Sequence, residues 1–502
     1  MTELPLSITD HLNNALQSLI YFAPETALVI LFLLLIITGL LFKNDADWIC
    51  RALCLLGLAF VFQRDVQQLY LIVSGPKFLF SNMLLLHHVS VLFKLIFAVL
   101  TFLIVIYIPL DQQLKAHQKG LSDLYAIIIA TVFGLHLMAM SANLLMIYLS
   151  VEMVSIGSYL LVSYRSESRL VAEAGLKYVL FGFAASAIML YGLSLLYAFT
   201  GTLDLFNGHF LEQLININSI PISLAILLVL AGIGFKLSFV PMHFWVPDVY
   251  EGAATPVVAF ISTSTKIAGF ALLANFLTPF VFFGKWNAFD FRLFFSIIAI
   301  ITMIAGNFAA ILQTNLKRML AYSAIGHTGF ALMVLVTFSQ QGVSALIFYL
   351  AVYALANIGA LMLCSFYAGK NSMLTVEDLR GAGKTEPFAG VCFVVLLISL
   401  TGLPVSAGFN GKVLVFSAVI AVYRESHNVW LLTLLVTGAV TTVVSLFYYF
   451  KIPLYLFLKS PEKTPALPAG NQQTSLLILI GLLSAIVLLL GIFPSVLANF
   501  LQ

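Results

Sequence analysis

Long apolar stretches, most of them about twenty residues long, follow one another along nearly the whole chain. An α-helix needs about 20 predominantly apolar residues to cross the hydrocarbon core of a bilayer. Strands of membrane barrels alternate polar and apolar positions instead, and these stretches are continuous. The pattern therefore predicts an all-α, polytopic membrane protein. The fourteen expected helices cover residues 22–42, 48–72, 83–108, 123–140, 143–164, 171–199, 222–244, 255–278, 293–314, 317–338, 342–368, 387–423, 429–457 and 474–498.

Two of these expected helices, the seventh and the twelfth, contain residues that break a helix. The stretch 222–244 includes Pro241, which follows two closely spaced glycines. The stretch 387–423 is too long for one straight crossing, and Gly402 and Pro404 suit a break within it. Irregular backbone inside a membrane is tolerated only where it is buried in protein or lines a wet cavity. In transporters such breaks mark ion paths, so we expect a path at each break.

The spacing of the predicted helices indicates an internal repeat. Helices 4–8 and 9–13 form two five-helix units, and the lysines of the broken helices, Lys236 and Lys412, are similarly spaced. Because five is an odd number, the second unit enters the membrane from the opposite side, which is typical of ion transporters. The predicted segments are an N-terminal three-helix segment (1–120), a first repeat (121–280), a second, inverted repeat (281–460) and a C-terminal helix (461–502).

The composition supports a membrane protein and argues against several other classes. Of 502 residues, 61% are hydrophobic and 9% are charged, whereas roughly a quarter of an ordinary soluble domain is charged. The net charge of +3 comes without a basic tract, so nucleic acid is not an expected partner. We expect no metal, iron–sulfur cluster or disulfide, because no cysteine stands in a ligand pattern. The cysteines are Cys50, Cys54, Cys364 and Cys392.

Neither nucleotide nor redox cofactor is expected on this chain alone. The sequence contains no G-x-x-x-x-G-K-[ST] phosphate loop, which argues against an ATP-driven pump. The loops between the predicted helices are too short to house a soluble cofactor domain.

The basic residues of the loops predict the orientation of the chain in its membrane. If both termini lie on the outer, periplasmic side, the cytoplasmic loops hold most of the basic residues, as the positive-inside rule requires. These are Lys43, Arg51, Lys115, Lys119, Arg165, Arg169, Lys317, Arg318, Lys370, Arg380, Lys384, Lys459 and Lys463. The outer loops then hold Lys77, Lys285, Arg292 and Arg424.

The remaining basic residues fall inside apolar spans. They are Arg64, Lys94, Lys177, Lys236, Lys266, Lys412 and Lys451. A lysine at a bilayer centre costs about 3 kcal/mol, so these residues need partners or water. Lysine suits a proton path because desolvation favours its neutral form and a nearby carboxylate favours the charged form. Arginine keeps its proton and cannot act in this way.

Glu152, Lys236, Lys266 and Lys412 are the strongest candidates for a proton relay. Lys236 and Lys412 stand at the two breaks, and Glu152 is an acidic residue deep in an otherwise uncharged span. Glu152 could alternatively form a static ion pair with a neighbouring helix.

Lys177 and His327 are further candidates. Lys177 follows Glu173 by four residues, so the two share a helix face and could form only a local pair. His327 lies in mid-helix among small polar residues and can pass a proton through both ring nitrogens, unless it is a satisfied core histidine.

Other charged residues receive structural interpretations. Arg64 and Asp65 are adjacent and are expected to neutralise each other locally. For Lys94, snorkelling to the interface and a functional role are both open, and Lys451 is expected to snorkel. His136 is more consistent with a core histidine than with a relay.

Four segments resemble the antiporter-like subunits of respiratory complex I, over about residues 120–460. They are GFKLSFVPMHFWVPDVYEG (234–252) continued by AATPVVAFISTSTKIAGFALL, NFAAILQTNLKRMLAYSAIGHTGFAL (307–332), GLPVSAGFNGKVLVF (402–416) and VEMVSIGSYLLVSYRSESRLVAEAGLKYVLFG (151–182). Among these subunits, PDVYEGAATP with the later Lys266 resembles subunit N. The first 120 residues fit less well, because His87 and His88 stand where many subunit N chains have an acidic residue.

The resemblance implies roles for individual residues. By it, Glu152 is the glutamate of helix 5, and Lys177, Lys236, Lys266, His327 and Lys412 are the titratable residues of helices 6, 7, 8, 10 and 12. Cytoplasmic water would protonate the group Lys236, Lys266 and Lys177, and Glu152 would tune Lys236. His327 would then pass the proton to Lys412, which releases it outside.

The implied function is proton translocation in the membrane arm of NADH–quinone oxidoreductase, without redox chemistry in this chain. FMN, iron–sulfur clusters and quinone would belong to partner subunits. The partners would be other membrane-arm subunits, including sister antiporter-like subunits, together with lipid, protons and water. A subunit of a multisubunit cation/proton antiporter is the alternative. A structural spacer is a third interpretation, but it would not need lysines at both breaks.

Overall fold

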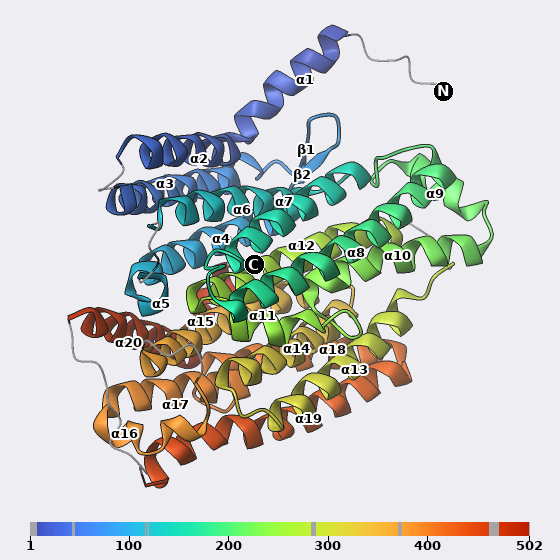
Figure 1. The fold of residues 1–502 in the computed structure, drawn as a ribbon. Coiled ribbons are helices and arrows are strands. Elements are labelled where there is room, and N and C mark those ends of the chain that lie inside the picture. Colours follow the sequence, from blue (N-terminus) through green and yellow to red (C-terminus); the bar gives the residue numbers. More distant parts are fainter. Residues whose placement is uncertain are drawn as a thin grey trace.

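The computed structural model describes residues 8–42, 46–115, 117, 120–282, 288–369, 374–460 and 471–500, and within them it is a bundle of helices (Figure 1). The helices are α1 Ile8–Tyr21, α2 Ala23–Leu41, α3 Ala46–Leu71, α4 His88–Tyr107, α5 Gln112–Lys115, α6 Ser122–Met140, α7 Leu144–Val162, α8 Arg169–Thr200, α9 Gly208–Ile215, α10 Ser219–Leu237, α11 Trp245–Gly252, α12 Thr255–Phe282, α13 Phe291–Ile311, α14 Leu316–Leu335, α15 Gln340–Ala368, α16 Ala382–Thr385, α17 Pro387–Thr401, α18 Ala407–Ser426, α19 Val429–Pro453, α20 Asn471–Ile492 and α21 Ser495–Phe500. Single turns of other helix types cover Ile108–Leu110 (η1), Glu377–Leu379 (η2) and Leu454–Leu458 (η3). The strands β1 Lys77–Leu79 and β2 Leu84–Leu86 pair as an antiparallel hairpin.

Twelve helices of the described chain are long and apolar enough to cross a membrane. They are α2, α3, α4, α6, α7, α8, α10, α12, α13, α15, α19 and α20. Helix α14 and the pair α17–α18 occupy the two remaining positions of the fourteen predicted. The predicted all-α, polytopic fold is therefore confirmed.

Some sequence-based expectations need correction or fall outside the described residues. A helix was expected from residue 83, but the chain forms the β1–β2 hairpin there and α4 begins at His88. Helix α1 precedes the first predicted span. The loop residues Lys43, Lys119, Lys285, Lys370 and Lys463, and the predicted boundary at 461, lie outside the described residues. The predicted division into segments and the orientation of the termini stay predictions.

The break in the seventh predicted helix lies between α10 and α11. Ser238 takes a left-handed conformation with φ of 57°, which ends α10 at Leu237. The backbone carbonyls freed at the break find side-chain donors. The Trp245 indole donates to Phe235 O at 3.1 Å, and the Thr328 hydroxyl donates to Leu237 O at 3.0 Å. The break is thus buried in protein, as membrane insertion requires.

The break in the twelfth predicted helix lies between α17 and α18. Gly402 ends α17 with φ of 81°, a left-handed conformation that glycine adopts without steric cost. Ser406 then caps α18 by accepting a hydrogen bond from the Phe409 backbone N–H. Both predicted breaks are therefore confirmed.

The order of the elements agrees with a repeat of five helices. The first set is α6, α7, α8, the broken α10–α11 and α12, and the second is α13, α14, α15, the broken α17–α18 and α19. The fourth member is the broken one in each set. The helices α12 and α15 are the most deeply buried of the membrane spans, with 94% of each span inside the protein. They lie between the blue N-terminal helices and the orange α19 (Figure 1).

Candidate functional site

Lys236 lies in the last turn of α10, where the break begins, and its side chain is buried. Its ammonium has no hydrogen-bond partner among the described residues and lies 5.9 Å from the centre of the Tyr159 ring of α7. Glu152 of α7 interacts with this ammonium electrostatically, although the two are not within ion-pair distance. One carboxylate oxygen of Glu152 is also buried without a partner among these residues. A buried polar atom without a hydrogen-bond partner in the protein needs a bridging water or a change in its protonation.

Lys266 of α12 links the first break to the second repeat. Its ammonium donates to Ala324 O at 3.3 Å and to the Thr328 hydroxyl at 3.5 Å, both on α14. The same hydroxyl donates to Leu237 O at the end of α10. Thr328 therefore connects Lys266 to the broken end of α10.

His327 lies next to Thr328 on α14, and hydroxyl groups contact both of its ring nitrogens. Nδ1 lies 2.7 Å from the Tyr349 hydroxyl of α15, and Nε2 lies 3.2 Å from the Tyr449 hydroxyl of α19. The Tyr449 hydroxyl also bonds Ser323. A histidine that is hydrogen-bonded on both sides can accept a proton at one nitrogen and release one from the other.

Lys412 of α18 completes this group at the second break. Its ammonium donates to Thr401 O, the last residue of α17, at 2.7 Å and to the Thr442 hydroxyl of α19 at 3.3 Å. Two cavities of about 10 Å³ each touch both His327 and Lys412. A cavity of that size holds about one water molecule. The geometry thus allows a proton to pass between the two residues through a single water.

The predicted candidates Lys236, Lys266, His327 and Lys412 follow one another along the interior of the protein. The His327 ring is close enough to both Lys266 and Lys412 for the charge of each lysine to act on it. Tyr349 and Tyr449 could not be recognised from the sequence, because the chain has 19 tyrosines and neither of these two stands in a distinctive motif. Their role follows only from their contacts with His327.

Lys177 lies apart from this interior group, although it was expected to belong with Lys236 and Lys266. Its side chain is 39% exposed and forms ion pairs with Glu173 at 2.9 Å and with Asp248 of α11 at 2.7 Å. The local pair with Glu173, which was left open, is present. Asp248 also contacts Arg318 at 2.7 Å, so α8, α11 and α14 meet in one ionic network.

Asp248 stands outside the membrane-spanning helices and is the centre of this network. Burial raises the pKa of Asp248, but hydrogen bonds from Lys177 and Arg318 outweigh it and hold the pKa below its ordinary value. Lys317, which was expected in a loop, is buried in the first turn of α14 and donates to Ala253 O at 2.7 Å. Asp248 was not among the predicted site residues, although it lies in the motif PDVYEG.

One expectation for the N-terminal helices is wrong. Arg64 does not neutralise Asp65, because adjacent residues of a helix do not face each other. Its guanidinium donates to Gln67 at 3.0 Å, whereas the Asp65 carboxylate lies 3.3 Å from the Lys94 ammonium. Of the two interpretations left open for Lys94, the structure excludes snorkelling, because Lys94 is completely buried beside Glu25. His136 is a core histidine, as the structural interpretation held.

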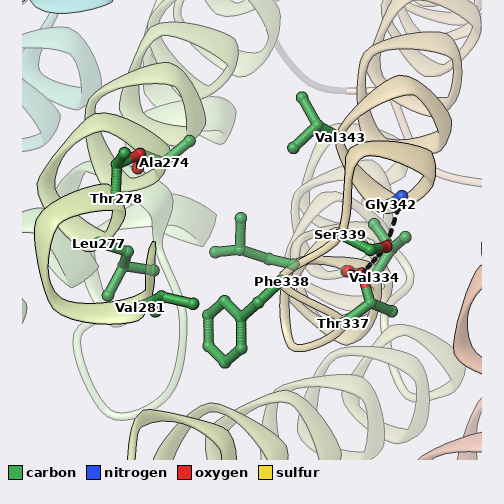
Figure 2. A pocket seen from close by; sticks show the side chains of 11 residues that line it. Ala274, Leu277, Thr278, Val281, Val334, Thr337, Phe338, Ser339, Gly342 and Val343 are labelled. Atoms are coloured by element: carbon green, nitrogen blue, oxygen red, sulfur yellow. Dashed lines mark hydrogen bonds between the residues drawn. The ribbon is translucent and has the colours of Figure 1, made fainter. Parts of the chain in front are cut away.

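A separate cavity of about 50 Å³ lies between the end of α12 and the turn from α14 to α15 (Figure 2). Its lining includes Leu277, Val281, Val334 and Phe338. No titratable side chain is among the described residues that line it. The described lining therefore contains no group that could take up a proton in the way that the buried lysines could.

Comparisons with known proteins agree with this architecture. A profile of the family described as "NADH:quinone oxidoreductase/Mrp antiporter, TM" matches residues 141–444. The NADH-quinone oxidoreductase subunit N of Chlorobium chlorochromatii is 36% identical, with 100% of this chain and 98% of the relative covered. Subunit N of Anaeromyxobacter sp. is 35% identical, with 96% and 95% covered.

Solved structures show the same fold. A chain of respiratory complex I from Thermus thermophilus is 29% identical with a TM-score of 0.77, and 95% of this chain and 98% of that chain are covered. A chain of the Mrp complex from Dietzia sp. has a TM-score of 0.79 over 95% of this chain and 96% of that chain. Its identity is 19%, so the likeness concerns the fold alone.

The two broken helices and the buried lysines beside them define an antiporter-like, multi-span membrane protein. Within that class, the full-length similarity shows that the chain belongs to the subunit N family of NADH-quinone oxidoreductases. It is therefore a subunit of the bacterial complex I membrane arm in the plasma membrane.

Proposed function

We propose that Lys236, Lys266, His327 and Lys412 form the proton path of this membrane subunit, and that Glu152 controls the charge of Lys236. Electron transfer from NADH to quinone would drive proton movement along this path. The FMN and iron–sulfur clusters for that electron transfer would lie in partner subunits. The contact of His327 with two hydroxyls and with two cavities shared with Lys412 is the observation that carries the proposal.

The path begins at the first break. Lys236 is buried and Glu152 is half-buried. The Lys236 ammonium and one buried carboxylate oxygen of Glu152 lack a hydrogen-bond partner among the described residues, so water between them would complete their coordination. A change in their separation would change the proton affinity of Lys236, because a nearby carboxylate favours the charged lysine. Lys236 is then the entry of the path, reached from the cytoplasmic side.

The middle of the path crosses from the first repeat to the second along α14. Thr328 and His327 are neighbours on this helix; Thr328 contacts Lys266 and His327 lies against Lys412 through the shared cavities. A proton that leaves Lys266 would pass through His327 and one water to Lys412. With both termini on the periplasmic side, Lys412 releases the proton there.

Lys177 would act on this path indirectly. Its ion pair with Asp248 holds α8 against α11, the short helix that follows the first break. Loss of the pair would loosen the broken element that carries Lys236, rather than remove a proton carrier.

The wider partners follow from the family. The subunit would contact sister antiporter-like subunits and lipid, and it would exchange protons with water on both sides. The antiporter alternative is less well supported, because the Mrp likeness extends only to the fold, whereas subunit N relatives match the entire chain.

The test is proton pumping by the whole complex in proteoliposomes, driven by NADH and quinone. Lys412→Met and Lys412→Arg should both abolish most pumping through this subunit, because neither side chain can take up and release a proton. Lys451→Met is the matched control, since Lys451 is also a lysine of the second repeat but lies near the end of α19. Wild-type pumping by Lys412→Arg would contradict the proposed path.

A further inference from the structure

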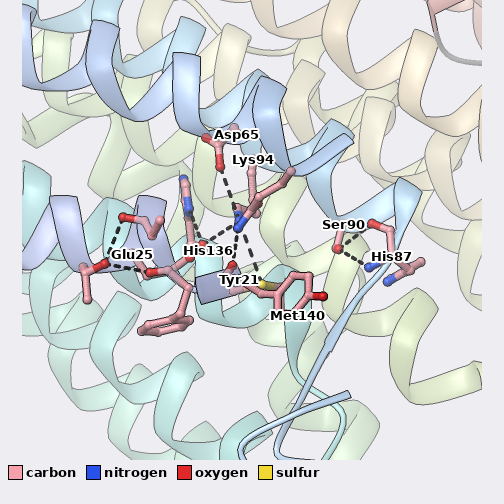
Figure 3. Close-up of polar contacts among 12 residues, drawn as sticks. Tyr21, Glu25, Asp65, His87, Ser90, Lys94, His136 and Met140 are labelled. Carbon is pink, nitrogen blue, oxygen red and sulfur yellow. Dashed lines mark hydrogen bonds and ion pairs between the residues drawn. The ribbon is translucent and has the colours of Figure 1, made fainter. Parts of the chain in front are cut away.

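Four helices each contribute one titratable side chain to a buried cluster that lies outside the proposed path (Figure 3). We call Glu25 of α2, Asp65 of α3, Lys94 of α4 and His136 of α6 the N-terminal charge cluster. All four side chains are completely buried, with no exposed surface. Charged groups in such surroundings are costly unless each is paired and hydrogen-bonded.

The Lys94 ammonium lies at the centre of the cluster. It is 2.6 Å from Glu25 Oε1 and 3.3 Å from Asp65 Oδ1, and it donates to the Gln68 carboxamide oxygen. His136 Nδ1 lies 3.0 Å from the same Glu25 oxygen. Because a carboxylate can only accept, Nδ1 carries the hydrogen of this bond.

The cluster resembles a metal site in its ligands but not in its charge. Ligand atoms of Glu25, Asp65 and His136 lie within 4.8 Å of one another, a spacing that would suit a cation. The Lys94 ammonium already stands against two of these three ligands, as Figure 3 shows. A divalent ion beside it would meet strong repulsion. The internal ammonium takes the place of the metal.

A count of charges shows that the cluster lacks one positive charge. If Glu25 and Asp65 are ionised, Lys94 is protonated and His136 is neutral, then two negative charges face one positive charge. Among the described contacts, no other charged side chain supplies the missing positive charge. Arg64 directly precedes Asp65 in the sequence, but its guanidinium contacts Gln67 and the ring of Phe60 instead. One additional proton would make the cluster neutral.

The contacts identify the residue that holds this proton. Glu25 Oε1 accepts from both Lys94 and His136, as an ionised carboxylate does. Asp65 has weaker support: within the described part of the chain, the Lys94 ammonium approaches its Oδ1 at 3.3 Å and neither oxygen has a hydrogen bond. Glu25 Oε2 also lacks a hydrogen bond there, but Glu25 Oε1 has two. His136 Nε2 has no partner among the described residues, so a proton on it would add a buried donor without an acceptor. Asp65 is therefore the carboxylate whose negative charge the described contacts stabilise least.

We propose that the N-terminal charge cluster is a second proton-binding site, in which Asp65 holds one exchangeable proton at neutral pH. The site is separate from the path over Lys236, Lys266, His327 and Lys412. A test of this second site therefore does not decide whether the proposed path over Lys412 is correct. The ligand of this site is a proton, and Glu25 is the permanent counter-ion of Lys94.

Infrared spectroscopy of the purified complex tests the site without any pumping assay. A protonated carboxylic acid gives a C=O stretching band that shifts when water is exchanged for D₂O. The wild-type spectrum should contain such a band, and it should be missing in Asp65→Asn. A spectrum of Asp65→Asn that keeps every protonated-carboxyl band of the wild type would overturn the proposal.

Two further variants make the assignment specific. Glu25→Gln should also remove the band, because Asp65 must then ionise to balance Lys94. Asp111→Asn is the matched control and should keep the band. Asp111 is a buried acid too, but both of its carboxylate oxygens accept hydrogen bonds, from two backbone N–H groups and from Ser365 at 2.6 Å. A band that Glu25→Gln removes and Asp65→Asn leaves would place the proton on Glu25 and refute the assignment.

Two measurements on the wild-type complex test the proposal even if the variants fail to assemble. Carbon-13 labelling of aspartate should shift the band, whereas labelling of glutamate should not. Added Na⁺ at constant pH should leave the band unchanged. Loss of the band on Na⁺ addition would identify a cation site, and a band that responds to labelled glutamate alone would exclude Asp65. Either result would overturn the proposal.

Discussion

Gly402 leaves the space that the Lys412 side chain fills: a Cβ at position 402 would lie 2.5 Å from Cδ of Lys412. The glycine has a second reason to be there, because its φ of 81° is one that other residues rarely adopt. One residue thus ends α17 and makes room for the lysine whose ammonium bonds the last carbonyl of that helix.

Gly402→Ala should therefore impair pumping by displacing Lys412, in addition to a backbone strain of about 1–2 kcal/mol. Gly201→Ala is the control, because Gly201 has φ of 67° and nothing lies within 4 Å of its added Cβ. Both variants should lower the thermal unfolding temperature of the complex, and only Gly402→Ala should reduce the proton-to-electron ratio. Equal pumping by the two variants would show that the space at 402 has no part in transport.

Removal of the Tyr449 hydroxyl should slow proton transfer at His327, since Nε2 then loses its partner at 3.2 Å. We expect Tyr449→Phe to reduce pumping several-fold while the complex assembles normally. Tyr367→Phe is the control, because the Tyr367 hydroxyl has no hydrogen-bond partner among the described residues and lines neither of the cavities at His327. The measurement is the rate of acidification in proteoliposomes. The same loss in both variants would argue for a packing defect.

Thr328→Val should break the connection between Lys266 and the end of α10. The substitution leaves Leu237 O without its side-chain donor, which costs about 1–3 kcal/mol for a buried group. Thermal denaturation of the complex measures this loss, and pumping should fall as well. Thr265→Val serves as control, because the Thr265 hydroxyl bonds only the Ile261 carbonyl of its own helix. Unchanged stability and pumping in Thr328→Val would rule out the link.

The influence of Glu152 on Lys236 can be measured with a double-mutant cycle. Glu152→Gln and Lys236→Met should each reduce pumping strongly, and the double variant should be little worse than either one. Residues that act as one unit give non-additive losses. Losses that simply add would show that the two residues act separately. Glu173→Gln combined with Lys236→Met provides the additive control, because Glu173 is exposed and pairs with Lys177.

The Asp248 network should stabilise the protein in a pH-dependent way. The pKa of Asp248 is lower in the folded protein, so its contribution is complete above the ordinary aspartate pKa of about 3.9 and disappears as the pH falls through the lower, folded value. Asp248→Asn should therefore lower the unfolding temperature at neutral pH, and the difference from wild type should vanish in acid. Glu173→Gln should have little effect at any pH, because exposed ion pairs contribute little. A difference that persists unchanged at low pH would contradict this assignment.

The sequence determined the features of this protein that depend on local chemistry. The length of an apolar run decides whether a helix can cross a membrane, so the spans could be predicted one by one. Glycine and proline act on their own backbone, and the breaks at Gly402 and near Pro241 followed from them. The cost of placing a lysine in hydrocarbon is large wherever it stands, which marked Lys236, Lys266 and Lys412 as candidates.

Only the tertiary structure decided which of these residues meet. The spans are apolar on nearly all faces, so the sequence carries little information about how each helix is rotated toward its neighbours. The pairing of Asp65 with Lys94 rather than with Arg64, and the position of Lys177 on Asp248, could not be predicted for that reason. Glu25 and His136 are 111 residues apart and come together only because α2 packs on α6. Contacts between distant helices depend on packing geometry, and packing is a property of the whole bundle.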